Sequence, residues 1–176
     1  MIIKQKFFIR TIFPRCMVLF AFILLLTGCG NQEHTQNKSA PDFMLSDTDG
    51  NRFYLSAQKD TVLLLNFWSV HCVPCLQEMP LLQKLYHDSK GKTVKIVGIC
   101  TDPAEAGYIS TFLKGFEITY PVLLDPEGQV ADLYKVTSLP TTFFVNGEGI
   151  IKESVIGYEN GYFKKYQHII EGLIQK

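Results

Sequence analysis

A cysteine pair between an apolar run and an amphipathic stretch constrains this fold more than any other feature. The apolar run Val62–Trp68 leads into Cys72–Cys75, which reads Cys-Val-Pro-Cys, and the amphipathic stretch Leu76–Tyr86 follows. This order predicts a buried strand, a short loop and a helix, with the first cysteine at the helix N-terminus. Unpaired backbone N–H groups and the helix dipole favour a thiolate there. The spacing therefore predicts thiol-disulfide chemistry.

Two other uses of Cys72 and Cys75 stay open at this point. A structural zinc site needs four ligands as a rule, and the other candidates show no second pair at ligand spacing: Cys100, His34, His71, His87 and His168. A purely structural disulfide would gain little chain entropy from closing so short a loop. We favour redox chemistry, with neither a metal nor a cofactor.

The first 28 residues are predicted to be a targeting segment. Four basic residues and no acids accompany the apolar run Cys16–Leu26, which is shorter than the ~20 residues of a membrane-crossing helix. Leu26-Thr27-Gly28-Cys29 resembles a bacterial lipoprotein box, which implies cleavage before Cys29 and a lipid on its sulfur. A generic secretory signal or an uncleaved anchor are the alternatives. Each version places the remaining chain outside the cytosol.

Residues 29–40 are predicted to form a flexible tether and residues 41–176 a single domain. Residues 31–40 are polar and lack a hydrophobic period, whereas the stretch from Pro41 onward is long enough for one domain. Residues 29–176 hold 13 basic and 17 acidic side chains, a net charge of −4. This balance argues against a nucleic-acid partner.

Strands and helices alternate along the domain. Asp49-Gly50 marks a hairpin near its start, Asp102 resembles a helix cap, and Pro80 lies inside the helix after the cysteines. The predicted strands are residues 43–45, 52–55, 62–68, 94–100, 120–124, 141–145 and 150–157, and the predicted helices are residues 76–86, 103–114, 130–135 and 160–175. The pattern predicts a three-layer α/β/α sandwich with an extra N-terminal β-hairpin.

A second site lies at Leu139-Pro140, where a loop meets the strand that starts at Thr141. A proline in this place is compatible with a cis peptide bond, although an ordinary trans proline is the commoner case. The upstream cysteine pair in this strand order favours the cis form.

Four motifs in order now support a family resemblance. They are Pro41-Asp42-Phe43 with Asp49-Gly50, Asn66-Phe67-Trp68-Ser69 before Cys72–Cys75, Glu78-Met79-Pro80, and Leu139-Pro140-Thr141-Thr142-Phe143-Phe144. On these motifs the chain resembles the thioredoxin superfamily, specifically its membrane-tethered, extracytoplasmic TlpA/ResA-like thiol-disulfide oxidoreductases. The resemblance implies a thioredoxin-like fold over the stretch from Pro41 to the C-terminal helix.

The predicted roles of Cys72 and Cys75 follow from their places at the helix N-terminus, and the resemblance implies the placement of Leu139 and Pro140. Cys72 would attack a substrate disulfide and Cys75 would resolve the mixed disulfide, while Leu139 and Pro140 would dock a bound peptide. Trp68 and His71 complete the predicted substrate-binding set. His71 is a departure from the family, which usually has tryptophan directly before the first cysteine.

Glu78 is the candidate for a proton relay, because it lies three residues after Cys75 and shares its helix face. In ResA-like proteins a glutamate at the matching position lies near the cysteine pair. A poorly solvated carboxylate there raises nearby thiol pKa values and can exchange a proton with Cys75. The alternative is a solvated glutamate that only benefits from the helix dipole.

The predicted function is reduction of disulfides in exported proteins, as the uncharged Val73-Pro74 between the cysteines weakly favours a reductant. The resemblance implies apocytochrome c among the substrates and a CcdA- or DsbD-like membrane donor. A Sco-like copper chaperone is one alternative. A thioredoxin-fold peroxidase is another, although Leu65 and Ser69 replace the proline and threonine of its PxxxTxxC motif. Cys100 is predicted to be a buried, inert thiol.

Overall fold

The structure is a computed structural model that describes residues 38–175. Within them, eight strands form one sheet in the order β1-β8-β7-β4-β5-β6-β2-β3. The strands are β1 (Lys38–Ser39), β2 (Met44–Asp47), β3 (Arg52–Tyr54), β4 (Val62–Trp68), β5 (Val94–Cys100), β6 (Val122–Leu124), β7 (Thr141–Val145) and β8 (Ile150–Ile156). β4, β5 and β6 run parallel, and the other neighbours are antiparallel.

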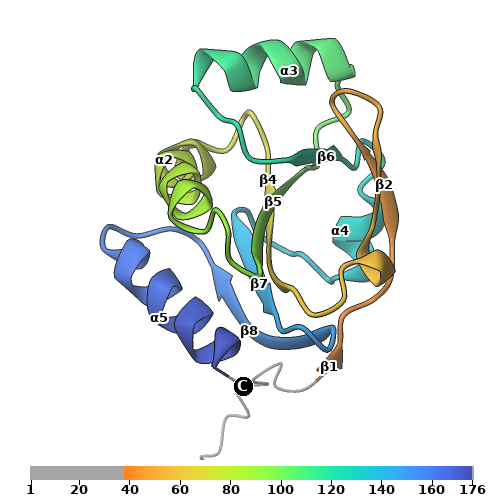
Figure 1. The fold of residues 1–176 in the computed structure, drawn as a ribbon. Coiled ribbons are helices and arrows are strands. Elements are labelled where there is room, and N and C mark those ends of the chain that lie inside the picture. The colour runs from red at the N-terminus through yellow and green to blue at the C-terminus, as the bar shows by residue number, and fades with distance from the viewer. Residues whose placement is uncertain (1–37, 176) are drawn as a thin grey trace, which may run out of the picture. The chain divides into compact units, whose positions relative to one another are not determined.

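Helices cover both faces of this sheet (Figure 1). α2 (Val73–Asp88), α3 (Ala106–Gly115) and α5 (Tyr162–Ile174) contribute to the core on one face, and α4 (Gln129–Leu133) and the short helix η1 (Leu55–Ala57) to the core on the other. Successive side chains of β4 alternate between the two cores, as the pleat requires. The thioredoxin-like sandwich with its extra N-terminal strands is thereby confirmed.

The central strands agree with the sequence, and the helix ends differ from it. β4, β5 and β7 have the predicted bounds, because each is rich in apolar or β-branched residues and almost entirely buried. α2 is longer than predicted and continues through Pro80. The predicted start of α3 after Asp102 is wrong: the helix begins at Ala106 with Glu105 as its N-cap. The Asp102 carboxylate has other partners, described with the site.

The N-terminal boundary also differs, because the tether was expected to reach residue 40. Lys38 and Ser39 pair with Ile151 and Ile150 of β8, and Ala40 belongs to the buried core. The sequence did not predict this two-residue strand at the sheet edge, because the segment is polar and has no hydrophobic period. The predicted signal segment, residues 1–28, and the predicted lipidation site Cys29 lie outside the described residues.

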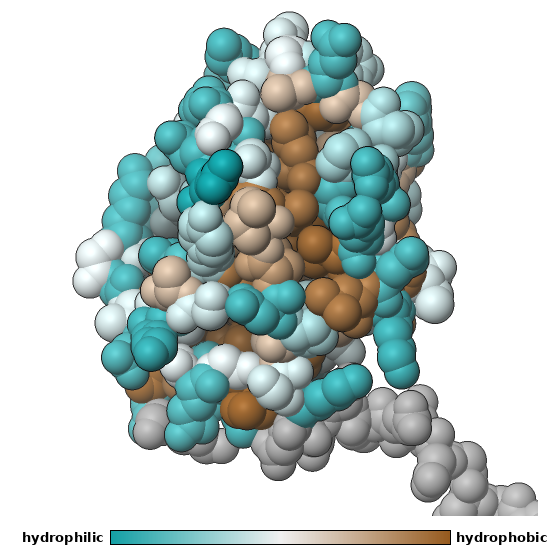
Figure 2. All heavy atoms as spheres, turned by 90° about the vertical axis from the view of Figure 1, so that its right-hand side faces the viewer, coloured by the Kyte–Doolittle hydropathy of each residue, from teal (hydrophilic) through white to brown (hydrophobic). Residues whose placement is uncertain are grey.

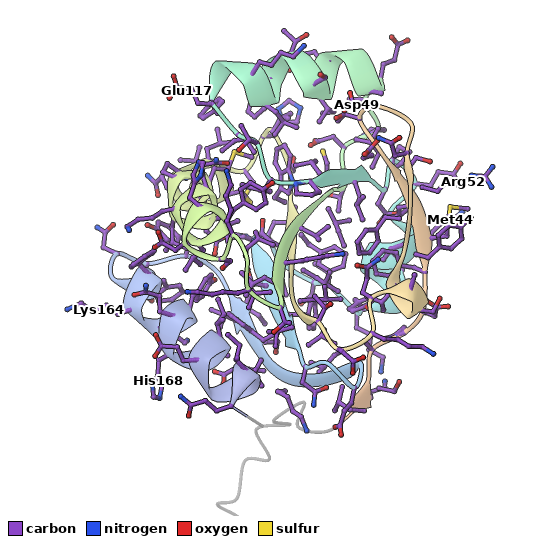
Figure 3. All side chains as sticks on the ribbon, in the orientation of Figure 1. Met44, Asp49, Arg52, Glu117, Lys164 and His168 are labelled. Atoms are coloured by element: carbon purple, nitrogen blue, oxygen red, sulfur yellow. A yellow bond between two sulfur atoms is a disulfide. The ribbon has the colours of Figure 1, made fainter. Side chains whose placement is uncertain are left out.

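Two surface features complete the fold. No helix within residues 38–175 has the length and apolar character that crossing a membrane requires. Figure 2 shows the side of the domain that carries β2, where an apolar strip runs between hydrophilic side chains. Met44 of β2 is 48% exposed and projects on this side (Figure 3).

Candidate active site

The loop between β4 and α2 carries the two cysteines, which form a disulfide with Sγ atoms 2.07 Å apart. Cys72 is the N-cap of α2, and its Sγ accepts a hydrogen bond from the Cys75 backbone N–H at 3.3 Å. The sulfur therefore lies where the helix presents unpaired N–H groups and its positive dipole end, as predicted. These groups stabilise a thiolate on Cys72 once the disulfide is reduced.

The two cysteines differ in accessibility. Cys72 is half-buried between exposed His71 and Val73, and Val73 is 63% exposed. Cys75, in contrast, is 2% exposed and belongs to the hydrophobic core between α2 and the sheet. An incoming sulfur therefore reaches Cys72, whereas Cys75 is available for attack within the molecule. This asymmetry fits the predicted division into attacking and resolving cysteines.

Asp102 holds the start of the active-site loop. Its Oδ1 accepts a hydrogen bond from Ser69 Oγ at 2.8 Å, and its Oδ2 accepts from the Val70 backbone N–H at 2.7 Å. Ser69 Oγ in turn accepts from the His71 backbone N–H at 3.1 Å. Asp102 follows β5, the parallel neighbour of β4. Its carboxylate therefore lies beside the end of β4 and holds the loop that begins there. Sequence reasoning assigned Asp102 to a helix cap and missed this role.

The Leu139–Pro140 peptide bond is cis, as predicted. β7 pairs antiparallel with β4, and Thr141 lies opposite Phe67. Pro140 therefore precedes β7 at the sheet edge from which the cysteine loop leaves β4. Leu139 is half-buried and packs against the same core as Cys72. The two predicted motifs thus meet at one end of the sheet.

Glu78 lies at the centre of a buried polar network. Tyr166 Oη donates to Glu78 Oε1 at 2.6 Å, and Asn66 Nδ2 donates to Glu78 Oε2 at 2.8 Å. Asn66 Nδ2 also donates to Thr142 Oγ1 at 2.9 Å. The four residues come from α2, α5, β4 and β7. One carboxyl group therefore ties both helices to the two central strands directly behind the cysteine loop.

Burial dominates the electrostatics of Glu78. Its side chain is 0% exposed, and this burial raises the pKa of the carboxyl to about 7, although the hydrogen bonds from Tyr166, Asn66 and Thr142 favour the charged form. The alternative of a solvated helix-end glutamate is therefore wrong. A carboxyl that titrates near neutral pH, one helical turn after Cys75, has the properties of a proton acceptor and donor for that thiol.

The two remaining predicted substrate-binding residues, Trp68 and His71, differ in their exposure to solvent. Trp68 is 0% exposed and stacks on Phe112 of α3 with ring centroids 6.0 Å apart. It supports the loop from inside, and the prediction that it contacts substrate is wrong. His71 is exposed on the loop and can meet a partner.

Cys100 ends β5 in the core, fully buried as expected. Its Sγ donates to Asp102 Oδ2 at 3.3 Å, and burial raises the pKa of the thiol to about 12. A thiol with this pKa stays protonated at neutral pH and is a poor nucleophile.

The described residues hold no group of three or more His, Cys, Asp and Glu side chains placed to bind a metal ion. His168 is exposed on α5 and projects away from the sheet (Figure 3). His87 lies near the end of α2, where its ring contacts Gln83.

Sequence reasoning assigned no role to Asn66, Thr142 or Tyr166. Asn66 did carry a signal, because it is the one polar residue in the run Val62–Trp68. A buried polar side chain needs a partner, and Glu78 is that partner. Tyr166 carried no such signal, since a tyrosine on the apolar face of a helix is usual in a core.

The chain resembles known thiol-disulfide proteins in sequence and in structure. The model of the AhpC/TSA family matches residues 37–154. The thiol-disulfide oxidoreductase ResA of Bacillus subtilis is 35% identical over 88% of this chain and 87% of the relative. A protein assigned as the thiol:disulfide interchange protein DsbE of Chlorobium tepidum superposes with a TM-score of 0.74 at 27% identity, over 79% of this chain and 97% of the other.

The exposed lipoprotein thioredoxin Etrx1 of Streptococcus pneumoniae is a further structural neighbour. It superposes with a TM-score of 0.63 at 26% identity, over 74% of this chain and 99% of the other.

Proposed function

Because this chain belongs to the AhpC/TSA family and is a thiol-disulfide oxidoreductase related to ResA, we propose that it reduces disulfides of exported proteins outside the cytosol. The observation that carries the proposal is the disulfide at the start of α2, with Cys72 accessible and Cys75 buried. The cis Leu139–Pro140 bond at the same sheet edge supports a peptide substrate.

The reaction transfers two electrons from the dithiol to the substrate. The Cys72 thiolate attacks one sulfur of the substrate disulfide, which forms a mixed disulfide and releases the first substrate thiolate. The Cys75 thiol then loses its proton to the Glu78 carboxylate and attacks Cys72 Sγ. This step closes the Cys72–Cys75 bond and releases the second substrate sulfur as a thiolate, which is protonated by the Glu78 carboxyl or by water. A dithiol donor returns the pair to its reduced form.

The location and the partners rest on the sequence and on the relatives. The lipoprotein-like box that ends at Cys29 supports a lipid anchor at the outer side of a bacterial membrane, and a neighbour in structure is itself an exposed lipoprotein. A dithiol outside the cytosol needs electrons from across the membrane, which supports a CcdA- or DsbD-like donor. Apocytochrome c, with its paired haem-site cysteines, is the proposed substrate class.

Trapping in the native membrane tests this proposal. Cys75→Ala prevents the resolving step, so substrates stay bound to Cys72 and can be identified after alkylation. We expect exported proteins with cysteine pairs, apocytochrome c among them, and none of them with Cys72→Ala/Cys75→Ala. Recovery of only a peroxide-derived sulfenic acid on Cys72 would overturn the reductase in favour of a peroxidase.

A further inference from the structure

The proposed reaction needs Glu78 to be charged at the moment when Cys75 loses its proton. Only a carboxylate can accept that proton, yet burial stabilises the neutral acid. Something in the protein must therefore offset the burial of Glu78. Besides the hydrogen bond from Thr142, the network around its carboxyl group supplies two side-chain donors, one on each oxygen.

Tyr166 makes the shorter of these two bonds, at 2.6 Å from Oη to Glu78 Oε1. Its hydroxyl lies 3.4 Å from Thr142 Oγ1, so the carboxyl is its nearer acceptor. The residue is 0% exposed, and its ring packs edge-on against Phe144 of β7 with centroids 5.1 Å apart. The hydroxyl is therefore fixed by packing and cannot turn out to solvent.

The other titratable groups around Glu78 do not replace this bond. Burial and the charge of Glu78 raise the pKa of Tyr120, which precedes β6, and burial and the charges of Glu159 and Glu78 raise the pKa of Tyr162 on α5. Tyr120 is 3% exposed, and its hydroxyl makes no hydrogen bond within the described residues. Cys75 precedes Glu78 by one turn on α2. Tyr166 alone among these groups donates to the carboxyl.

We propose that Tyr166 is a positioning residue of the redox site, whose hydroxyl orients the Glu78 carboxyl and stabilises its charged form so that it can take the proton of Cys75. This role rests on the proposed function, because it matters only if Cys75 resolves a mixed disulfide. α5 thereby takes part in the chemistry although it carries neither cysteine.

Tyr166→Phe tests the proposal, because phenylalanine keeps the ring and removes only the hydroxyl. A hydrogen bond to a charged group is worth enough to raise the pKa of Glu78 by roughly one to two pH units when it is lost. Tyr120→Phe is the matched control, since it also removes one buried tyrosine hydroxyl, and that hydroxyl makes no hydrogen bond to Glu78. Carboxyl NMR of the oxidised protein follows Glu78 in both variants without any need for activity.

A kinetic measurement then connects the titration to the reaction. In single-turnover reduction of a disulfide-bonded peptide, the midpoint of the pH profile should rise with the pKa of Glu78 in Tyr166→Phe. The loss at pH 7 should be about five-fold for a rise of one pH unit, and it should vanish at high pH. Tyr120→Phe should follow the wild-type profile, and Tyr166→Phe in a Glu78→Gln background should add no change.

The outcomes separate the two levels of the proposal. An unchanged Glu78 titration in Tyr166→Phe, or an equal change in Tyr120→Phe, overturns the role of Tyr166. A wild-type protein that reduces no disulfide overturns the proposed function. The NMR titration of Glu78 then still tests whether the Tyr166 hydrogen bond stabilises the charged carboxylate. A titration that moves without the pH profile of reduction overturns the link to Cys75.

Discussion

Two neighbouring strands of this sheet, β4 and β5, lead to cysteines of opposite chemistry. β4 leads into the loop of Cys72, and β5 ends at Cys100, which lies opposite Trp68 in the parallel register. Cys72 caps a 16-residue helix and is accessible from outside. Cys100 is fully buried, and its thiol has a pKa raised to about 12. Only the three loop residues 69–71 lie between Cys72 and Trp68, the strand residue that pairs with Cys100.

Each of these cysteine sites also has a buried carboxyl group, and the two groups have different partners. Glu78, one turn after Cys75, is bound by side chains from two strands and a helix. Asp102, two residues after Cys100, binds the hydroxyl and backbone of the active-site loop. We propose that the first carboxyl exchanges a proton with Cys75, whereas the second holds the start of the active-site loop. The groups around each cysteine, more than the cysteine side chain itself, therefore decide whether it is reactive or inert.

The largest expected effect separates the two sites by activity. Cys72→Ala or Cys75→Ala should reduce insulin-disulfide turnover to the uncatalysed rate, because each removes a sulfur that forms or breaks a bond. Cys100→Ala should leave turnover close to that of the wild type. Loss of turnover in Cys100→Ala, with a native circular dichroism spectrum, would place Cys100 in the redox machinery and break the comparison.

The next effect concerns pH and the burial of Glu78. Its pKa is raised from 4.5 in the unfolded chain to about 7 in the fold, so the folded state binds the extra proton. The associated stability is present below about pH 4.5 and is lost as the pH rises through 7, a difference of roughly 3 kcal/mol. Glu78→Gln should lack this loss. Urea unfolding of the oxidised proteins at pH 5 and pH 8 measures it.

Equal pH dependence of the unfolding free energy in the wild type and Glu78→Gln would contradict the burial of a titrating carboxyl. The comparison between pH 5 and pH 8 within each protein matters here, because glutamine changes the hydrogen bonds at every pH. Lys164→Ala, a change at an exposed position on α5, serves as a control and should keep the wild-type pH dependence.

A smaller effect is expected at the second carboxyl. Asp102→Ala leaves the Val70 backbone N–H without its acceptor and should lower the free energy of unfolding by about 1–3 kcal/mol. Glu105→Ala, at the exposed N-cap of α3, makes no side-chain cap bond and should change it by less than about 0.5 kcal/mol. Denaturant titration compares the two, and equal losses would show that Asp102 does not brace the loop.

The smallest effect is expected at Cys100 itself. In the reduced native protein, iodoacetamide at pH 8 should label Cys72 quickly and leave Cys100 unmodified, because a thiol with a pKa of about 12 has about one thiolate in ten thousand at this pH. Peptide mapping measures both sites in one sample. Labelling of Cys100 at a rate similar to that of Cys72 would show that the end of β5 opens to solvent.

The extent to which the sequence predicted the structure differs between local and long-range features. β4, β5 and β7 were predictable because each is mainly apolar and β-branched, and the Cys72–Cys75 unit because its spacing between a strand and a helix favours redox chemistry. The first strand, Lys38–Ser39, was not predictable, since two polar residues carry no period. Its pairing with β8 depends on contacts that lie more than a hundred residues apart.

The same distinction applies to the site. Glu78 was predicted from its place one turn after Cys75, but its three partners come from elements that only the fold brings together. Asp102 shows how a local signal misleads. Asp-Pro is typical of a helix start, yet the Val70 N–H and Ser69 Oγ, more than thirty residues earlier, use the carboxylate instead.

The most direct test of the account is the position of the first covalent bond to substrate. Reduced Cys75→Ala protein is mixed with a disulfide-bonded peptide, and the adduct is located by peptide mass mapping. The account predicts half of the peptide attached to Cys72 and none at Cys100. No adduct at Cys72, or an adduct at Cys100, would contradict the assignment of Cys72 as the attacking thiol.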